Sequence, residues 1–389
     1  MRTPSSRTSR PFCATGRRAS QYGVTLVELM VGLLLGMLTV LIITQVLALS
    51  EGKKRTISSG SDAQVNGSLA LYTLQRELQM AGYGIAAKAE ALGCPIQGTF
   101  TATGTPTVTE AFAGTLAPVL ITAGTNGAPD QLTVLQGRKT GFSVPIVVSA
   151  QSTDYFTVLS SLGAQAGDVM VAVPSIWNAT APCRLFSVTD DGLGSPSNTG
   201  LWALRVPHTE GGATSWNDNT TLATTTASYL LNLGNLGYSV FSIGANQSLQ
   251  ISTRTASAPT STSDLFPQIV NMKALYGKDT NGDGVVDTYD NITPVNNVQW
   301  RQVLTIRVAV VARSTQYEKS SSDESDAVTQ SNPLWDLGAT STVTGVVNCN
   351  GASKCLALKV DQAADWKHYR YKVYDTTVPL RNILWNSAS

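Results

Sequence analysis

The stretch GVTLVELMVGLLLGMLTVLIITQVLAL, residues 23–49, decides how the rest of the chain is organised. From Leu29 to Leu49 it contains no charged side chain, and as an α-helix that run is about 30 Å long, the thickness of the hydrocarbon core of a bilayer. One carboxylate, Glu28, lies where the run begins. A lone ionisable residue at that depth is costly to bury, so Glu28 is expected to have a function.

An arginine-rich segment precedes the apolar run and ends at Gly23. Residues 1–22 contain five arginines and no acidic residue. In a secretory signal the small-residue cleavage site follows the apolar core, which is then discarded. Here the glycine precedes the core, so cleavage after Gly23 keeps the helix on the mature protein and makes Val24 its N-terminus. A secretory signal or a plain membrane anchor leaves the pairing of Gly23 with Glu28 unexplained.

Gly23, the Val-Thr-Leu-Val that follows it and Glu28 resemble the class III signal of type IV pilins and pseudopilins. The resemblance implies that a prepilin peptidase cleaves between Gly23 and Val24 and methylates the new amine of Val24, although most members of the family have phenylalanine there. It also implies that Glu28 acts in assembly. In a low-dielectric bundle of helices its carboxylate would neutralise the N-terminal amine of a neighbouring subunit.

The helix is expected to continue to residue 84, where Gly82-Tyr83-Gly84 ends it. Gly52, Gly60 and Gly67 each weaken a helix by about 1 kcal/mol relative to alanine, which favours a break between its two halves. The predicted parts are a leader (1–23), an N-terminal helix (24–84, with its transmembrane half at 24–49) and a head (85–389). Apolar residues at three- and four-residue spacing predict one buried face on the second half of the helix. They are Val65, Leu69, Leu71, Tyr72, Leu74, Leu78 and Ala81.

The head is poor in charged residues and rich in Ser, Thr, Gly and Asn, which indicates an exported, loop-rich β protein. An alternating run around Arg307, VLTIRVAVVAR at 303–313, predicts a strand in the centre of a sheet. Residues 93–127 are expected to be loop with a few short strands, and residues 190–200 and 209–221 to be polar loops. Further antiparallel strands are predicted at 132–135, 144–148, 155–159, 169–173, 185–188, 201–206, 238–243 and 249–253.

Two segments carry a narrower resemblance. LQRELQMAGYG at 74–84 and RYKVYDTTVPLRN at 370–382 resemble the helix end and the C-terminus of PilW-type minor pilins, and more distantly J-type pseudopilins of type II secretion. The resemblance implies an α+β, pilin-like fold in which the long helix packs on an antiparallel sheet beside a loop-rich β region. It further implies a non-enzymatic minor pilin that primes assembly, sits at the pilus tip and supports adhesion or twitching motility.

The implied location is the inner membrane, with one span and most of the chain in the periplasm, and afterwards the pilus tip at the cell surface. The implied partners are other minor pilins, the major pilin, the prepilin peptidase and a tip adhesin. A J-type pseudopilin is the nearest alternative. Residues 90–260 match no part of the family pattern, so a pilus-displayed, ligand-binding adhesin with its site in the polar loop 209–221 is a second alternative.

Residues 279–290, DTNGDGVVDTYD, have the spacing of a calcium-binding loop. An aspartate at the last position, where helix-flanked sensors have glutamate, favours a structural Ca²⁺ site of an exported protein, and a turn without metal is the alternative. PilW-type proteins often carry a similar segment, matched here by Tyr276, Gly277 and residues 279–284. The predicted ligands are the side chains of Asp279, Asn281, Asp283, Asp287 and Asp290 and the carbonyl of Val285.

Cysteines and histidines narrow the chemistry. Outside the leader the chain has Cys94, Cys183, Cys349 and Cys355, an even number that in an exported protein predicts disulfides. Of three possible connectivities, the short spacing favours Cys349–Cys355, which leaves Cys94–Cys183; free buried thiols are the alternative. The two histidines, His208 and His368, are far apart in sequence, so a base-assisted nucleophile is not expected. The sequence has no stripe of basic residues, so nucleic-acid binding is not expected.

Overall fold

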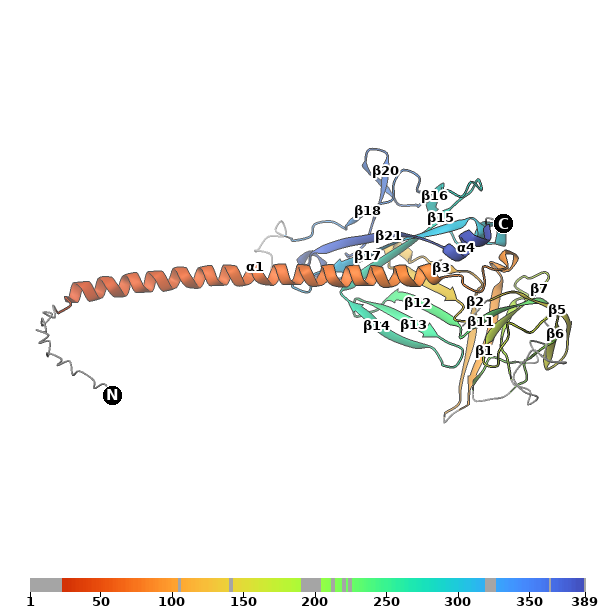
Figure 1. Cartoon of the computed structure of the whole chain (residues 1–389). Helices are drawn as coiled ribbons and strands as arrows, with labels where there is room; N and C mark the ends of the chain where they lie inside the picture. Colours follow the sequence, from red (N-terminus) through yellow and green to blue (C-terminus); the bar gives the residue numbers. More distant parts are fainter. Residues whose placement is uncertain are drawn as a thin grey trace, which may run out of the picture. The chain divides into compact units, whose positions relative to one another are not determined.

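A computed structural model describes residues 23–103, 106–139, 143–189, 204–210, 214–218, 222, 226–318, 327–363 and 365–387. The predicted leader before Gly23, the polar loop 190–200 and parts of the loop 209–221 lie outside the described residues. The chain forms two compact units, Met1–Thr56 and Ile57–Ser389. The expected α+β class with antiparallel sheets is confirmed (Figure 1).

Helix α1 (Leu26–Met80) runs through both units without interruption. Its segment Leu26–Lys54 is long and apolar enough to cross a membrane, judged by length and composition. The expected break near the glycines is wrong. A glycine lowers helix propensity but, unlike proline, keeps its backbone hydrogen bond, so separate glycines among good helix formers leave the helix intact.

The second half of α1 buries a narrower face than the sequence suggests. Leu74, Leu78 and Ala81 are fully buried, as predicted, and Ala63 and Ala70 lie on the same face. The predicted members Val65, Leu69 and Tyr72 are exposed instead. Position 65 is two residues from position 63, which places its side chain on the opposite side of a helix with 3.6 residues per turn.

A four-stranded antiparallel sheet packs on this buried face, in the order β16-β15-β17-β21. Its strands are β15 (Ile269–Lys278), β16 (Thr288–Asp290), β17 (Val303–Arg313) and β21 (Tyr371–Pro379). The predicted strand 303–313 is confirmed as β17, at its predicted central position. Ile306, Val308, Val310 and Ala312 share one core cluster with α1, whereas Ala309 and Val311 point to the other face.

A small three-stranded sheet covers that other face. It consists of β18 (Leu334–Asp336), β20 (Ser353–Ala357) and β19 (Val347–Asn350), with Trp335 and Leu358 packed against Val311. The side chain of Arg307 links the two sheets, because its Nη2 lies 2.7 Å from the carbonyl oxygen of Asp336 and 2.9 Å from Oδ2 of Asp375. The inner strands β15 and β17 are therefore buried on both faces.

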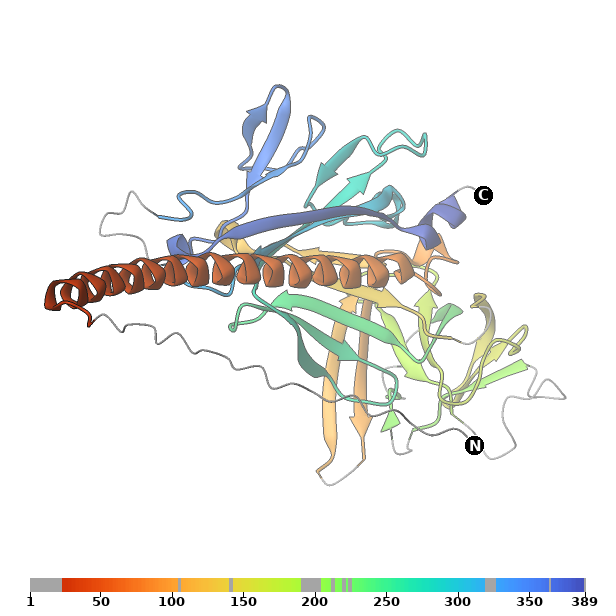
Figure 2. The ribbon, with the colours of Figure 1, turned by 60° about the vertical axis from the view of Figure 1, so that its left-hand side comes forward.

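A five-stranded sheet lies on the other side of the second half of α1 (Figure 2). Its side chains at Ile121, Val134, Phe241 and Leu249 belong to the same core cluster as Leu74 and Leu78. In spatial order its strands are β14 (Ser261–Pro267), β13 (Ser248–Arg254), β12 (Gly237–Ile243), β4 (Gln131–Gln136) and β3 (Val119–Thr122).

The remaining strands form a nine-stranded sheet, in which β1 and β8 pair in parallel and the other pairs are antiparallel. Its path is β10-β1-β8-β7-β11-β5-β6-β9, and β2 pairs with β1. A second core cluster, around Phe156, Met170 and Phe186, packs on it. The strands are β1 (Pro95–Ala102), β2 (Val108–Thr115), β5 (Ile146–Gln151), β6 (Tyr155–Val158), β7 (Val169–Pro174), β8 (Cys183–Ser187), β9 (Arg205–Pro207), β10 (Thr214–Ser215) and β11 (Ala227–Gly234).

Two sequence expectations fail in this sheet. Residues 93–127 were expected to be mostly loop, but β1 and β2 pair along eight residues each, and many of their threonine and alanine side chains are too small to give an apolar pattern. Within the expected loop 209–221, Trp216 is fully buried against Phe100 and Phe112. Short helical segments complete the fold: η1 (Ala89–Ala91), η2 (Thr125–Gly127), α3 (Asn297–Arg301), η5 (Trp366–His368) and α4 (Arg381–Ser387).

Candidate functional site

The segment before α1 presents the predicted processing and assembly residues. Gly23, Val24 and Glu28 are all exposed, and Glu28 lies in the first turn of the helix. The hydroxyl of Thr25 accepts a hydrogen bond from the backbone N–H of Glu28 (3.2 Å), which caps the helix. Thr25-x-x-Glu28 is a capping-box pattern, a signal in the sequence that marks where this helix begins. Glu28 is the sole charged residue between Val24 and Ser50.

The other end of α1 is held by the C-terminal segment. Nδ2 of Asn382 in α4 donates a hydrogen bond to the carbonyl oxygen of Ala81 (2.9 Å). The N–H of Gly82 donates to the carbonyl oxygen of Leu135 (2.9 Å). Gly82 has φ +80°, the left-handed conformation that ends many helices. The carbonyls left open at a helix end are thus partly satisfied by residues distant in sequence.

The helix packs tightly against the four-stranded sheet at Gly67. A Cβ at this position would lie 2.4 Å from Cε2 of Tyr374 in β21 and 3.1 Å from Cβ of Ala312 in β17. No side chain fits without a shift. Gly67, one of the residues from which a helix break was expected, instead allows a close contact between the helix and the sheet.

The predicted calcium loop follows β15 and is closed by its own hydrogen bonds. The buried carboxylate of Asp279 accepts from the N–H groups of Gly282 (2.6 Å) and Gly284 (2.7 Å). The half-buried Asp287 accepts a hydrogen bond from the N–H of Thr280 (2.7 Å), which lowers the pKa of the Asp287 carboxyl group.

Asn281 and Asp283 lie on the same exposed turn, where Nδ2 of Asn281 donates to Oδ2 of Asp283 (3.1 Å). The loop thus offers the side chains of Asp279, Asn281, Asp283 and Asp287, oxygen donors of the kind that Ca²⁺ prefers. Val285 follows in the exposed part of the turn.

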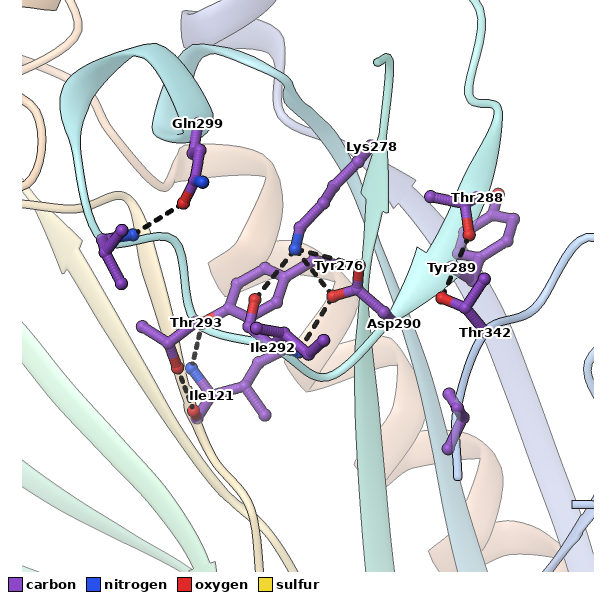
Figure 3. Close-up of polar contacts among 12 residues, drawn as sticks. Ile121, Tyr276, Lys278, Thr288, Tyr289, Asp290, Ile292, Thr293, Gln299 and Thr342 are labelled. Atoms are coloured by element: carbon purple, nitrogen blue, oxygen red, sulfur yellow. Dashed lines mark hydrogen bonds and ion pairs between the residues drawn. The ribbon is translucent and has the colours of Figure 1, made fainter. Parts of the chain in front are cut away.

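Asp290 is not brought together with the other predicted ligands. Nζ of Lys278 lies 2.7 Å from Oδ1 and 2.9 Å from Oδ2 of Asp290, so both carboxylate oxygens face the lysine (Figure 3). The same Nζ donates to the carbonyl oxygen of Ile292 (2.9 Å). In the β15–β16 ladder Asp290 lies opposite Tyr276, which makes Lys278 its diagonal neighbour, within reach of a long side chain.

The strand that precedes the loop is fixed to the five-stranded sheet. The buried hydroxyl of Tyr276 accepts a hydrogen bond from the N–H of Ile121 in β3 (2.7 Å; Figure 3). Burial raises the pKa of Tyr276 to about 12. The loop therefore extends from a rigid strand, which favours a structural role for it.

The comparison with known protein families matches this part of the molecule. Residues 238–382 match the family model PilW, described as type IV pilus-assembly protein W. This segment is that of a PilW-type pilus protein. A comparison with curated proteins and one with solved structures gave no significant match.

The PilW segment has a clear place in the fold. It begins in β12, includes the whole four-stranded sheet and the loop 279–290, and ends at Asn382, the residue that caps α1. The match places the chain in type IV pilus assembly and in a family of structural and assembly proteins. Helix α1 and the nine-stranded sheet lie outside it.

Both favoured disulfides are present, one inside the PilW segment and one outside it. Cys349–Cys355 staples the β19–β20 hairpin, and Cys94–Cys183 joins the start of β1 to β8. Among the described residues, Asp336, Cys349 and Cys355 also bring three ligand atoms within 4.8 Å of one another, but the two cysteine sulfurs are already bonded to each other.

The two histidines lie in separate parts of the head. His208 is buried against the rings of Phe156 and Phe186, and His368 stacks on Tyr317. Each contacts aromatic rings, in agreement with the packing role that the sequence favoured.

Proposed function

We propose that this PilW-type protein is a minor pilin of a type IV pilus, with the pilin architecture of a long helix half in the membrane and half on a sheet. A prepilin peptidase cleaves it after Gly23 and methylates Val24. The apolar part of α1 holds it in the inner membrane with the head in the periplasm. It then joins other minor pilins in a complex that primes assembly and sits at the tip, in contact with the major pilin and an adhesin.

The observation that carries the proposal is the position of Glu28. It is the one carboxylate on an exposed apolar helix whose other side chains, up to Ser50, carry no charge. Burying such a helix among others is favourable only if the carboxylate gains a cationic partner. The methylated amine of Val24 of a neighbouring subunit has the right charge and lies at the corresponding depth. The helix therefore fits a filament core better than a plain anchor.

Replacement of Glu28 by alanine tests the role in assembly. We expect export, processing and folding to be unchanged while the protein disappears from sheared pili. Glu51→Ala, which removes the next acidic residue beyond the apolar run, is the matched control and should leave incorporation normal. Normal amounts of the Glu28→Ala protein in pili would refute the proposed role.

Intact mass and N-terminal analysis test the processing. The proposal expects a chain that begins at methylated Val24 in membranes and in trace amounts in filaments. A chain that keeps its leader, or one that begins near Glu51, would mean an anchored or a secreted protein.

A J-type pseudopilin of type II secretion would use the same residues. Deletion of the gene separates the two functions, since loss of pili with normal secretion supports the minor pilin, and the reverse result supports the pseudopilin.

One observation favours a pilus-displayed adhesin as a second candidate. The nine-stranded sheet outside the PilW match borders a cleft of about 540 Å³ whose wall includes the exposed side chains of Val144, Leu159 and Leu162. Deletion of the polar loop 209–221 is not a suitable test, because it removes the buried Trp216. Leu162→Asp is better: loss of adhesion with normal piliation would support this candidate.

A structural Ca²⁺ is a further part of the proposal. Asp279, Asn281, Asp283, Asp287 and the carbonyl of Val285 would hold it, and the ion would neutralise three carboxylates on one turn. Asp290 takes no part while it is paired with Lys278. Calcium should raise the melting temperature of the head, and the variant Asp283→Ala should abolish the increase; an unchanged melting temperature with calcium and with chelator would refute this.

A further inference from the structure

Three polar side chains meet in the interior of the head, away from the PilW segment. Lys139 follows β4, Asp168 precedes β7 and Asn232 lies in β11. Oδ2 of Asp168 accepts from Nζ of Lys139 (2.5 Å) and from Nδ2 of Asn232 (2.7 Å). The side chains of Lys139 and Asp168 are 5% and 13% exposed, and Asn232 is 1% exposed. An amine and a carboxamide thus share one buried carboxylate oxygen.

We propose that Lys139 and Asn232 join in an intramolecular isopeptide bond, with Asp168 as the proton carrier. The ammonium group of Lys139 gives a proton to Asp168 and becomes a neutral amine. Its lone pair attacks Cγ of Asn232, and a bond forms between Nζ and Cγ. Asp168 passes the first proton to Nδ2, so that the bond between Cγ and Nδ2 breaks, and then takes the second proton from Nζ. The ammonia that leaves carries this second proton away as ammonium, and Asp168 is a carboxylate again. No oxidant or other reactant is consumed.

The contacts of Asn232 orient it for this step. Its Oδ1 accepts from the N–H of Gly234 (2.7 Å), which stabilises the negative charge that develops on the oxygen during attack. Its Nδ2 also donates to the carbonyl oxygen of Gly163 (2.6 Å), so the rotation of the amide is fixed. The carboxamide oxygen of Asn232 thus accepts from a donor, and its nitrogen donates to an acceptor.

The backbone holds the lysine beside the asparagine. The N–H of Arg138 donates to the carbonyl oxygen of Leu233 (2.7 Å), and a Cβ on Gly234 would lie 2.7 Å from Cα of Lys139. Fixing two reactants in this way raises their effective concentration by several orders of magnitude. A buried lysine amine beside a base is also the usual arrangement for a nucleophilic lysine.

Another buried ion pair of this chain provides an internal contrast. Nζ of Lys273 lies 2.7 Å from Oδ1 of Asp130. The other groups that donate to this carboxylate are the backbone N–H groups of Gly124 and Ala274. No carboxamide shares that carboxylate among the contacts of the described residues. Lys273 should therefore remain a free amine and serve as the control.

Peptide mapping of the full chain, purified from membranes, reduced, alkylated and digested with trypsin, tests the proposal. Trypsin does not cleave after an acylated lysine, so the bond produces residues 139–184 joined to residues 206–254, with the mass of one ammonia missing. Two results would overturn it. One is a full yield of the separate peptide 140–184. The other is loss of water within peptide 139–184, which would mean a bond between Lys139 and Asp168.

Variants separate the chemistry from a purely structural role. Lys139→Arg keeps the positive charge but cannot form the bond, and Asp168→Asn keeps the shape but cannot carry protons. We expect the joined peptide to be absent from both and present in full in Lys273→Arg. Joined peptide in Asp168→Asn at the wild-type level would overturn the role of Asp168. Because the wild-type map alone decides whether the bond exists, a variant that fails to fold does not affect that result.

Discussion

Replacing Gly67 by alanine tests how closely α1 contacts the four-stranded sheet. Alanine is normally better than glycine in a helix interior by about 1 kcal/mol. Here its Cβ would lie 2.4 Å from the ring of Tyr374, with Ala312 behind at 3.1 Å, and overpacking of this kind costs about 1–3 kcal/mol. We expect the free energy of unfolding to fall by about 1 kcal/mol, the difference between these two effects.

The assay is urea unfolding of the full chain in detergent, followed by tryptophan fluorescence. Gly60→Ala on the same helix is the matched control, since a Cβ there meets nothing within 4 Å, and it should be neutral or stabilising by up to about 1 kcal/mol. Combining Gly67→Ala with Tyr374→Ala should remove the penalty and give a coupling energy of about 1–3 kcal/mol. Equal effects of the two glycine substitutions, or no coupling to Tyr374, would refute the close contact.

Three further predictions concern the head. Lys278→Met or Asp290→Leu alone should lower the free energy of unfolding by about 3–5 kcal/mol, because each leaves a buried charge unpaired. The double variant should lose less stability than either single variant. An equal or larger loss in the double variant would contradict the pairing. Removing Cys94–Cys183 should cost about 4–5 kcal/mol and removing Cys349–Cys355 about 2, because the first closes the longer loop; the reverse order in urea unfolding would contradict this. Since burial raises the pKa of Tyr276 from 10.0 to about 12, the stability that its protonated form contributes should be complete below pH 10 and lost as the pH rises towards 12; an equal alkaline loss in Tyr276→Phe would exclude this cause.

The sequence predicted best where one physical pattern dominated. Residues 303–313 are mostly apolar because both faces of β17 are covered, and this long apolar run correctly predicted a strand in the centre of the sheet. The six-residue separation of Cys349 and Cys355 suits a hairpin, and the remaining pair followed by elimination. The apolar run after Glu28 directly marked the first half of α1.

The sequence predicted less well where contacts between distant segments decide. Nothing near Asp290 shows that Lys278 takes both its oxygens, because that contact depends on the register of two strands. Glycine at position 67 suggested a break, since the ring of Tyr374 that requires it lies far away in the sequence. The burial of Trp216 was also missed, because its neighbours in the sequence are polar and Phe100, on which its ring packs, lies far away in the sequence.

The position of β21 and α4 late in the chain affects the order in which the protein forms. β21 pairs with the whole length of β17, and Asn382 reaches back across 301 residues to the end of α1. Contacts of such sequence separation form slowly, and they cannot begin until residues 371–387 have left the ribosome. A chain interrupted before Tyr371 keeps an open strand edge and an uncapped helix, which makes it a ready substrate for proteases. Chains that lack residues 371–387 are therefore expected to be degraded, and chains that contain them to persist.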